Sequence, residues 1–307
     1  MKKIFCFTLF SLSFSAFSLV DYSAPVAEDS PAQASPVKNR PASISNLSRV
    51  DSSSADTSQK VFSLNSGFET LEVPYKNKNN KVSIYSIGGH FQTPYNIFLD
   101  ASYWSAGVRN STISSRNHEQ WGNPALKLGF NWLKFGAAQD LSTVDFYAGA
   151  MLPGQKKSDF ASTRTDKFLG VEITKRFYDF ALQLGYEMRV VGTPQTEKET
   201  AVGNIQKLSA ALGWKVSSDI RFGVEGILYK LASNHLEKPN TALSKDLEFA
   251  YVSPKMILTL ASFVDLELGA LYQTRKIEIK DDVIEARLWD VKGLYGNSLF
   301  ANLSFSL

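Results

Sequence analysis

Apolar and polar residues alternate along much of the chain after its first 60 residues. The clearest case is Phe180–Val190, where Phe, Leu, Tyr, Met and Val hold every second position and Ala, Gln, Gly, Glu and Arg hold the others. This period of two is the pattern of a β-strand with two different faces, and eleven residues suffice to cross a bilayer at a tilt. Similar alternation occurs in residues 125–132, 220–229 and 264–273.

Short, aromatic-flanked turns recur about every 42 residues between these segments, and long polar stretches separate them. Extending the period to both ends of the patterned region gives six hairpins, or about twelve strands, with ten or fourteen left open. Short connections at one end and long ones at the other are the layout of a transmembrane β-barrel. The five turns are Thr93–Asn96, Lys134–Asp140, Tyr178–Asp179, Val216–Asp219 and Ala261–Phe263.

The fold class that follows is all-β: a closed antiparallel transmembrane barrel over residues 61–307, because an open sheet edge cannot be satisfied in lipid. Its first strand, near Val61–Val73, is weakly patterned, and Pro254 predicts a bulge in the strand around Leu247–Thr259. We expect the long loops to face outward. They are Ser105–Gly122, Pro153–Thr165, Gly192–Gly203, Leu231–Lys245 and Ile279–Gly296.

A soluble barrel or sandwich would also alternate, with its apolar face inward. Two features favour the membrane instead: glycines and both signs of charge share the polar face, and aromatic residues recur where strands meet the short turns. These aromatics predict a girdle at one membrane interface. They are Trp132, Tyr178, Trp214 and Phe263.

The first 60 residues differ in composition from the rest. Residues 1–18 combine Lys2 and Lys3, an apolar run and a small-residue site, which is typical of a secretory signal peptide. Residues 19–60 are rich in Ser, Ala and Pro and poor in aromatic residues, so we expect a disordered periplasmic segment: a spacer, a lumen plug or a tether.

Removal of the leader would leave 31 basic and 30 acidic residues and no cysteine, since the single Cys6 lies in the leader. A near-neutral chain gives no charge basis for binding nucleic acid. A chain without cysteine excludes disulfides, thiol catalysis and thiolate metal sites. We expect no cofactor and no metal, because His90, His118 and His235 lack ligand-like spacing.

The charged residues of the polar strand faces are the candidate lumen lining. Their mixed signs predict a narrow polar pore, whereas pairing of Glu187 and Arg189 with Arg221 and Glu225 would fill the lumen. The candidates are Lys127, Glu172, Glu187, Arg189, Lys207, Lys215, Arg221, Glu225, Lys255, Asp265, Glu267 and Arg275.

The last nine residues, Leu299–Leu307, alternate and carry Leu303, Phe305 and Leu307 on one face. This strand resembles the C-terminal signal of Gram-negative outer-membrane β-barrel proteins, although that signal usually ends on Phe and this chain ends on Leu. The resemblance implies contact with outer-membrane lipid, recognition by the barrel-assembly machinery, and a cell outer membrane location with both termini periplasmic. It identifies an architecture more than an activity.

Three function classes follow from such a barrel. The first is a narrow diffusion channel for small hydrophilic solutes, and the second is a closed-lumen structural or surface-interaction barrel. The third is a hydrolase, but no histidine lies two residues before a serine, as the phospholipases of this membrane require. We therefore expect no enzyme and favour the channel.

Overall fold

The computed structural model describes residues 62–108, 112–114, 119–136, 140–234, 242–243 and 245–306. The expected leader 1–18 and segment 19–60 lie outside these ranges, as do His118, His235 and Leu307. In the described part of the chain, no helix is long and apolar enough to span a membrane.

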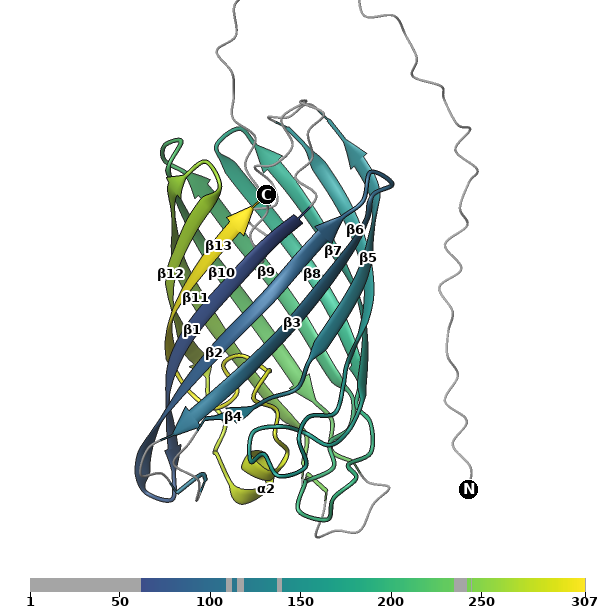
Figure 1. Ribbon diagram of the computed structural model, residues 1–307, viewed down its shortest axis with the longest axis vertical. Helices are drawn as coiled ribbons and strands as arrows, with labels where there is room; N and C mark the ends of the chain where they lie inside the picture. Colours follow the sequence, from purple (N-terminus) through teal and green to yellow (C-terminus); the bar gives the residue numbers. More distant parts are fainter. Residues whose placement is uncertain are drawn as a thin grey trace, which may run out of the picture. The chain divides into compact units, whose positions relative to one another are not determined.

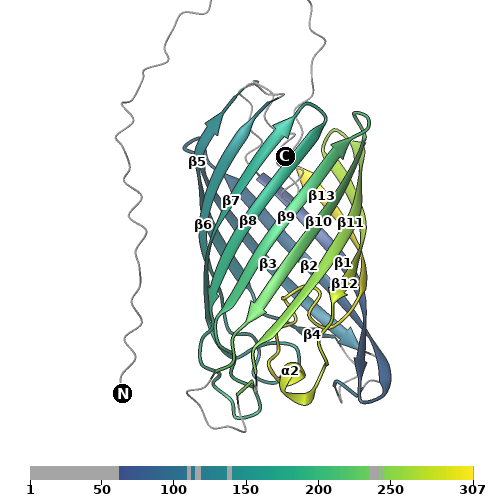
Figure 2. The same ribbon diagram turned by 180° about the vertical axis from the view of Figure 1, so that it is seen from behind.

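Twelve long strands form one antiparallel sheet that closes on itself as a barrel (Figures 1 and 2). Pairing of β1 with β13 and of β2 with β3 gives each long strand two neighbours, which confirms the closed all-β fold and fixes the strand number. The strands are β1 Phe62–Tyr75, β2 Lys78–Gln92, β3 Ile97–Val108, the two-residue β4 Gln120–Trp121, β5 Ala125–Phe135, β6 Ser142–Met151, β7 Asp166–Phe177, β8 Phe180–Val190, β9 Ile205–Lys215, β10 Ile220–Leu231, β11 Leu247–Ala261, β12 Val264–Arg275 and β13 Ser298–Ser306.

All five expected short turns join consecutive strands, at β2–β3, β5–β6, β7–β8, β9–β10 and β11–β12. They lie at the end of the barrel where β13 finishes, which we call the short-turn end; the opposite end is the long-loop end (Figure 1). One connection at the long-loop end is also short. Lys76 and Asn77 join β1 to β2 with φ of 52° and 59°, the left-handed geometry of a two-residue hairpin.

The irregularity expected in the strand around Pro254 lies elsewhere in that strand. Pro254 pairs with Val224 in an unbroken β10–β11 register, and the register toward β12 is the same on both sides of it. The shifts fall between Ala250 and Tyr251 and between Thr259 and Ala261. Proline therefore fits this wall without a bulge of its own.

The two faces of each strand differ in exposure as the alternation predicts. On β8, Leu184 is 59% exposed and its neighbour Gln183 only 7%. Leu128 on β5 and Phe222 on β10 are likewise exposed, while Arg221 is buried. An apolar face outside and a polar face inside is the arrangement that a lipid-spanning barrel requires, because lipid replaces water around the outer wall.

A hydrophobic core lies inside the barrel toward the long-loop end. Buried side chains of β1, β10, β11 and β12 pack there against the segment that connects β12 to β13. That segment contains the helix α2, Asp281–Glu285, and lies within the barrel mouth in both views (Figures 1 and 2). This loop therefore folds back into the barrel instead of extending away from it.

Candidate functional site

The barrel lumen near the short-turn end is lined by a row of paired polar side chains. Asp100 on β3 binds the Nδ1 atom of His90 on β2, and Lys127 Nζ on β5 lies 2.6 Å from the other carboxylate oxygen of Asp100. Lys127 also lies over the ring of Tyr147, 5.2 Å from its centroid. Adjacent strands place these residues opposite one another on the inner face, so sequence-distant charges meet in one row.

Further pairs follow on the opposite wall. Arg221 Nη2 lies 3.2 Å from Asp265, which also accepts a hydrogen bond of 2.6 Å from Thr259. Deeper in the lumen, Lys255 Nζ lies 3.9 Å from Glu225. The sequence suggested that Arg221 and Glu225 pair with Glu187 and Arg189 on β8. In the structure they instead meet Asp265 on β12 and Lys255 on β11.

The middle of the lumen collects carboxylates, a lysine and a tyrosine. Tyr147 on β6 donates a hydrogen bond of 3.0 Å to Glu187 on β8, and Lys207 on β9 is opposite Glu187 in the register. Glu172 on β7 and Glu267 on β12 are buried on the same inner face. Between the short-turn end and the middle of the lumen, the inner wall thus carries both signs of charge.

Three of the twelve expected lining residues lie at the ends of the strands. Lys215 is half-buried beside the short turn after β9. Arg189 near the end of β8 pairs with Asp290 of the β12–β13 segment at 2.6 Å. Arg275 is exposed at the end of β12, where it pairs with Glu248, so it belongs to the rim rather than to the lumen.

The segment Lys276–Asn297, which we call the plug, fills the lumen at the long-loop end. Its buried side chains include Leu288, Leu294 and Tyr295, each at most 3% exposed, and Trp289 stacks on Tyr295 at 4.0 Å between ring centroids. Tyr295 donates to the carbonyl of Val283 and accepts from the amide of Leu288. The plug is therefore a folded element with its own apolar contacts.

The rim of the barrel holds the plug at its first turn. Tyr75 at the end of β1 donates a hydrogen bond of 2.5 Å to Asp281, and Lys76 Nζ lies 3.3 Å from the same carboxylate. The hydrogen bond from Tyr75, supported by Lys76, lowers the pKa of the Asp281 carboxyl below its usual value. The β1–β2 turn is thereby tied to α2.

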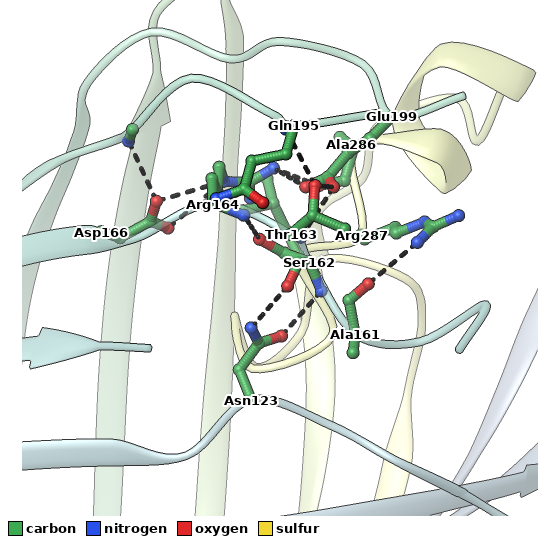
Figure 3. A network of polar contacts seen from close by, with 12 residues as sticks. Asn123, Ala161, Ser162, Thr163, Arg164, Asp166, Gln195, Glu199, Ala286 and Arg287 are labelled. Carbon is green, nitrogen blue, oxygen red and sulfur yellow. Dashed lines mark hydrogen bonds and ion pairs between the residues drawn. The ribbon is translucent and has the colours of Figure 1, made fainter. Parts of the chain in front are cut away.

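A buried charge network joins three loops around the plug (Figure 3). Arg164, only 2% exposed, donates to Glu199 at 2.7 Å, to the carbonyl of Ala286 at 2.9 Å and to Asp166 at 3.2 Å. The second oxygen of Glu199 accepts from both the amide and the hydroxyl of Thr163, each at 2.8 Å. One guanidinium thus links the loop before β7, the loop after β8 and the plug.

Two more contacts extend this network. Arg287 of the plug donates to the carbonyls of Ser158 and Ala161 at 2.9 and 3.0 Å. Asn123, before β5, makes two hydrogen bonds of 2.8 Å with the backbone of Ser162 (Figure 3). Because Arg164, Glu199 and Asp166 are buried as partners of one another, removal of Arg164 leaves both carboxylates uncompensated.

The expected interface aromatics lie exposed beside short turns. Trp132, Tyr178, Trp214 and Phe263 are all on the outer surface, and Trp214 stacks on Phe180 of the neighbouring strand at 6.1 Å between centroids. In the last strand, Phe305 is exposed and Leu303 half-buried on the outer face. Leu307 lies outside the described residues.

No protein-family model matches this sequence, and no curated protein matches it. Among solved structures, the COG4313 outer membrane channel from Pseudomonas putida F1 is similar, with a TM-score of 0.59 at 8% identity over 83% of this chain and 100% of that chain. The chain has the fold of an outer-membrane β-barrel.

Two further solved barrels resemble it less closely, and their TM-scores are too low to support an argument. The NanC porin has a TM-score of 0.49 at 12% identity and covers 80% of this chain and 100% of its own. Outer membrane phospholipase A from Escherichia coli has a TM-score of 0.42 at 12% identity and covers 79% of this chain and 92% of its own.

Sequence reasoning missed several residues of this outer-membrane barrel's interior. Asp100 and Tyr147 stand on the inner face, and the alternation of their strands would have placed them there. Arg164 and Glu199 lie in loops without periodicity, so no pattern indicated their contact. The plug did carry a signal, because Leu288, Trp289 and Tyr295 are unusually apolar for an outward-facing loop.

Proposed function

We propose that this outer-membrane barrel is a narrow channel for small hydrophilic solutes, with both termini and the short turns on the periplasmic side. The observation that carries the proposal is the inner wall of β2, β3, β5, β10 and β12, where acids and bases alternate instead of apolar side chains. Polar solutes can enter a lumen with such a wall, because the polar groups of the wall replace part of the water that hydrates the solute.

The plug makes this channel a gated one. Its apolar contacts fill the long-loop end, so solute passage requires the plug to loosen from Arg164 and from the β1–β2 turn. A lumen that is polar toward the short-turn end and closed by a hydrogen-bonded loop at the long-loop end is consistent with a closed state of a channel.

A second function is favoured by the same plug. The inner hydrophobic core and the buried Arg164–Glu199 pair are the features of a permanently filled barrel, whose loops would serve as a structural or surface-interaction element. The two functions differ in whether removal of the plug creates conductance.

Single-channel recording in a planar bilayer separates them. Two proteins are compared: the refolded mature chain and a variant in which residues 280–293 are replaced by a short Gly/Ser linker. For a gated channel we expect rare, small openings in the first and steady conductance in the second. A matched control instead replaces the exposed turn residues 217–219, at the short-turn end, with Gly-Ser-Gly, and its conductance should equal that of the unaltered chain. Silence in both proteins would establish the filled barrel.

A further inference from the structure

Two inward-facing serines in the middle of the wall are exposed to solvent, Ser86 on β2 and Ser102 on β3. Ser86 lies over Gly67 of β1 on the inner face, and Ser102 is two residues from the inward-facing Asp100. On β9, at the far side of the closed sheet, the inward-facing Ala211 is buried. Water therefore reaches the lumen wall along β2 and β3, between the plug and the short-turn end.

Neutral polar groups and an aromatic ring line the strands beside these serines. Asn302 of β13 also lies over Gly67, so its amide and the hydroxyl of Ser86 approach each other from either side of β1. A glycine at this point leaves space that a larger side chain would fill. Two residues toward the plug, Phe300 of β13 is half-buried on the same face. We call this part of the lumen wall the open sector; it consists of Gly67, Glu69, Ser86, Phe300 and Asn302.

The open sector presents two charged groups without partners of opposite sign. Glu69 of β1 is half-buried opposite Phe300 and forms no hydrogen bond or ion pair with any residue that the structure describes. Lys292 of the plug is exposed, and its Nζ atom lies over the Phe300 ring, 5.7 Å from the centroid. It has no ion pair within the described part of the chain. The neighbouring Glu267 of β12 is only 6% exposed, so Glu69 and Lys292 are the charges that solvent reaches here.

These two charges lie near one another without touching. The carboxylate of Glu69 interacts electrostatically with Tyr251 of β11, and Gly293, the residue after Lys292, packs against the same ring. Both charged residues also adjoin Phe300. They are nevertheless more than 4 Å apart, so a solute that carries both signs of charge has room to contact each of them.

One cation, one anion, neutral hydrogen-bonding groups and an aromatic ring match a small zwitterion such as an α-amino acid. We propose that the open sector binds such a solute; this deepens the channel function proposed above by naming its solute class, and rests on that function for the solute's route. The carboxylate of the solute contacts Lys292 and its ammonium group contacts Glu69. Its apolar part packs on Phe300. A lone anion or a lone cation would leave one charge of the sector uncompensated.

The absence of cysteine from the mature chain makes a thiol in the open sector a specific reporter. In the full mature protein, refolded in nonionic detergent, we expect Ser86→Cys to react rapidly with methyl methanethiosulfonate and Ala211→Cys to react slowly, as followed by mass spectrometry. L-Alanine should slow the reaction of Ser86→Cys several-fold. Propionate, which lacks the ammonium group, and ethylamine, which lacks the carboxylate, should have little effect at the same ionic strength.

Charge variants of the Ser86→Cys protein complete the test. Glu69→Gln and Lys292→Gln should each abolish the protection by L-alanine. The exchange Glu69→Lys with Lys292→Glu should restore part of it, because a zwitterion can bind in the reversed orientation. Lys230→Gln, at an exposed position outside the lumen, should leave the protection unchanged. Heat-dependent gel migration verifies that each variant is folded.

The assay needs no current, so its outcome is separate from that of the channel function. Equal protection by propionate or ethylamine, no protection by L-alanine, or protection that survives Lys292→Gln would overturn the zwitterion site even in a barrel that conducts. A slow reaction of Ser86→Cys would overturn the open sector itself. Protection by L-alanine in a barrel that never conducts would support the site and contradict the channel.

Discussion

At the residue scale, Arg164 is the side chain on which the closed mouth most depends. It has hydrogen bonds to Glu199, Asp166 and the plug carbonyl of Ala286, and its side chain is 1% exposed. A buried ion pair of this kind adds little net stability compared with apolar residues of the same size. Removal of one partner is nevertheless strongly destabilising, because the remaining charge stays buried without compensation.

Arg164→Ala is therefore expected to destabilise the closed plug by about 3 to 5 kcal/mol, because Glu199 and Asp166 remain buried without their cation. The measurement is the rate of trypsin cleavage after Arg287 and Lys292, which should rise strongly in the folded barrel. Lys198→Ala removes an exposed charge of the same loop and should leave cleavage unchanged. Equal cleavage in both variants would show that the plug is held by its apolar contacts alone.

At the element scale, a strand of this barrel has two faces with different tolerance for charge. On β2, Ile87 is 57% exposed on the outer face. The adjacent Ser86 faces inward, and its hydroxyl occupies the place that a side chain on Gly67 of β1 would take. The two positions share one strand and one depth, so a comparison between them isolates the effect of the face.

Ile87→Arg should lower the free energy of unfolding by about 2 to 4 kcal/mol if it lies near the bilayer midplane, since a cation in lipid is poorly solvated. Ser86→Arg should have a much smaller effect, because its side chain enters a polar lumen on the side of Asn302. Urea unfolding of the refolded barrel in vesicles, followed by tryptophan fluorescence, measures both. A larger destabilisation by Ser86→Arg than by Ile87→Arg would show that Ser86, and not Ile87, is on the lipid-facing side of β2.

At the scale of the whole molecule, the charge balance of the lumen determines selectivity. The twelve lumen-lining residues expected from the sequence are seven basic and five acidic residues, which predicts a modest anion preference. The structure moves Arg275 to the rim and adds Glu69, Asp100 and Asp145 to the inner wall. The balance becomes six bases and eight acids, and opposite charges in pairs largely cancel one another's fields.

For the variant with residues 280–293 replaced, we therefore expect a reversal potential close to zero in a salt gradient, with at most a slight cation preference. Lys127→Gln should shift the preference further toward cations, because it leaves Asp100 paired with His90 alone. The exposed change Lys230→Gln outside the lumen is the control. A marked anion preference would indicate that ions follow another path than this inner wall.

The sequence by itself determined the wall of this protein. The period-two alternation, the spacing of the turns and the aromatic residues beside them depend only on neighbouring residues, so the closed sheet, its strand number and its five short turns were predictable. The faces of β8 and β10 followed for the same reason, since a strand's pleat fixes which side each residue takes.

Only the tertiary structure decided what fills the barrel. Glu225 meets Lys255 of the neighbouring strand, Arg221 reaches Asp265 two strands away, and Arg189 meets Asp290 of the plug. Single-strand patterns carry no information on such partners. The plug and the Arg164 network join segments up to 206 residues apart, whose contacts arise only once the closed wall has brought their loops to one end. The late start of β13 follows from the same inward turn of the chain.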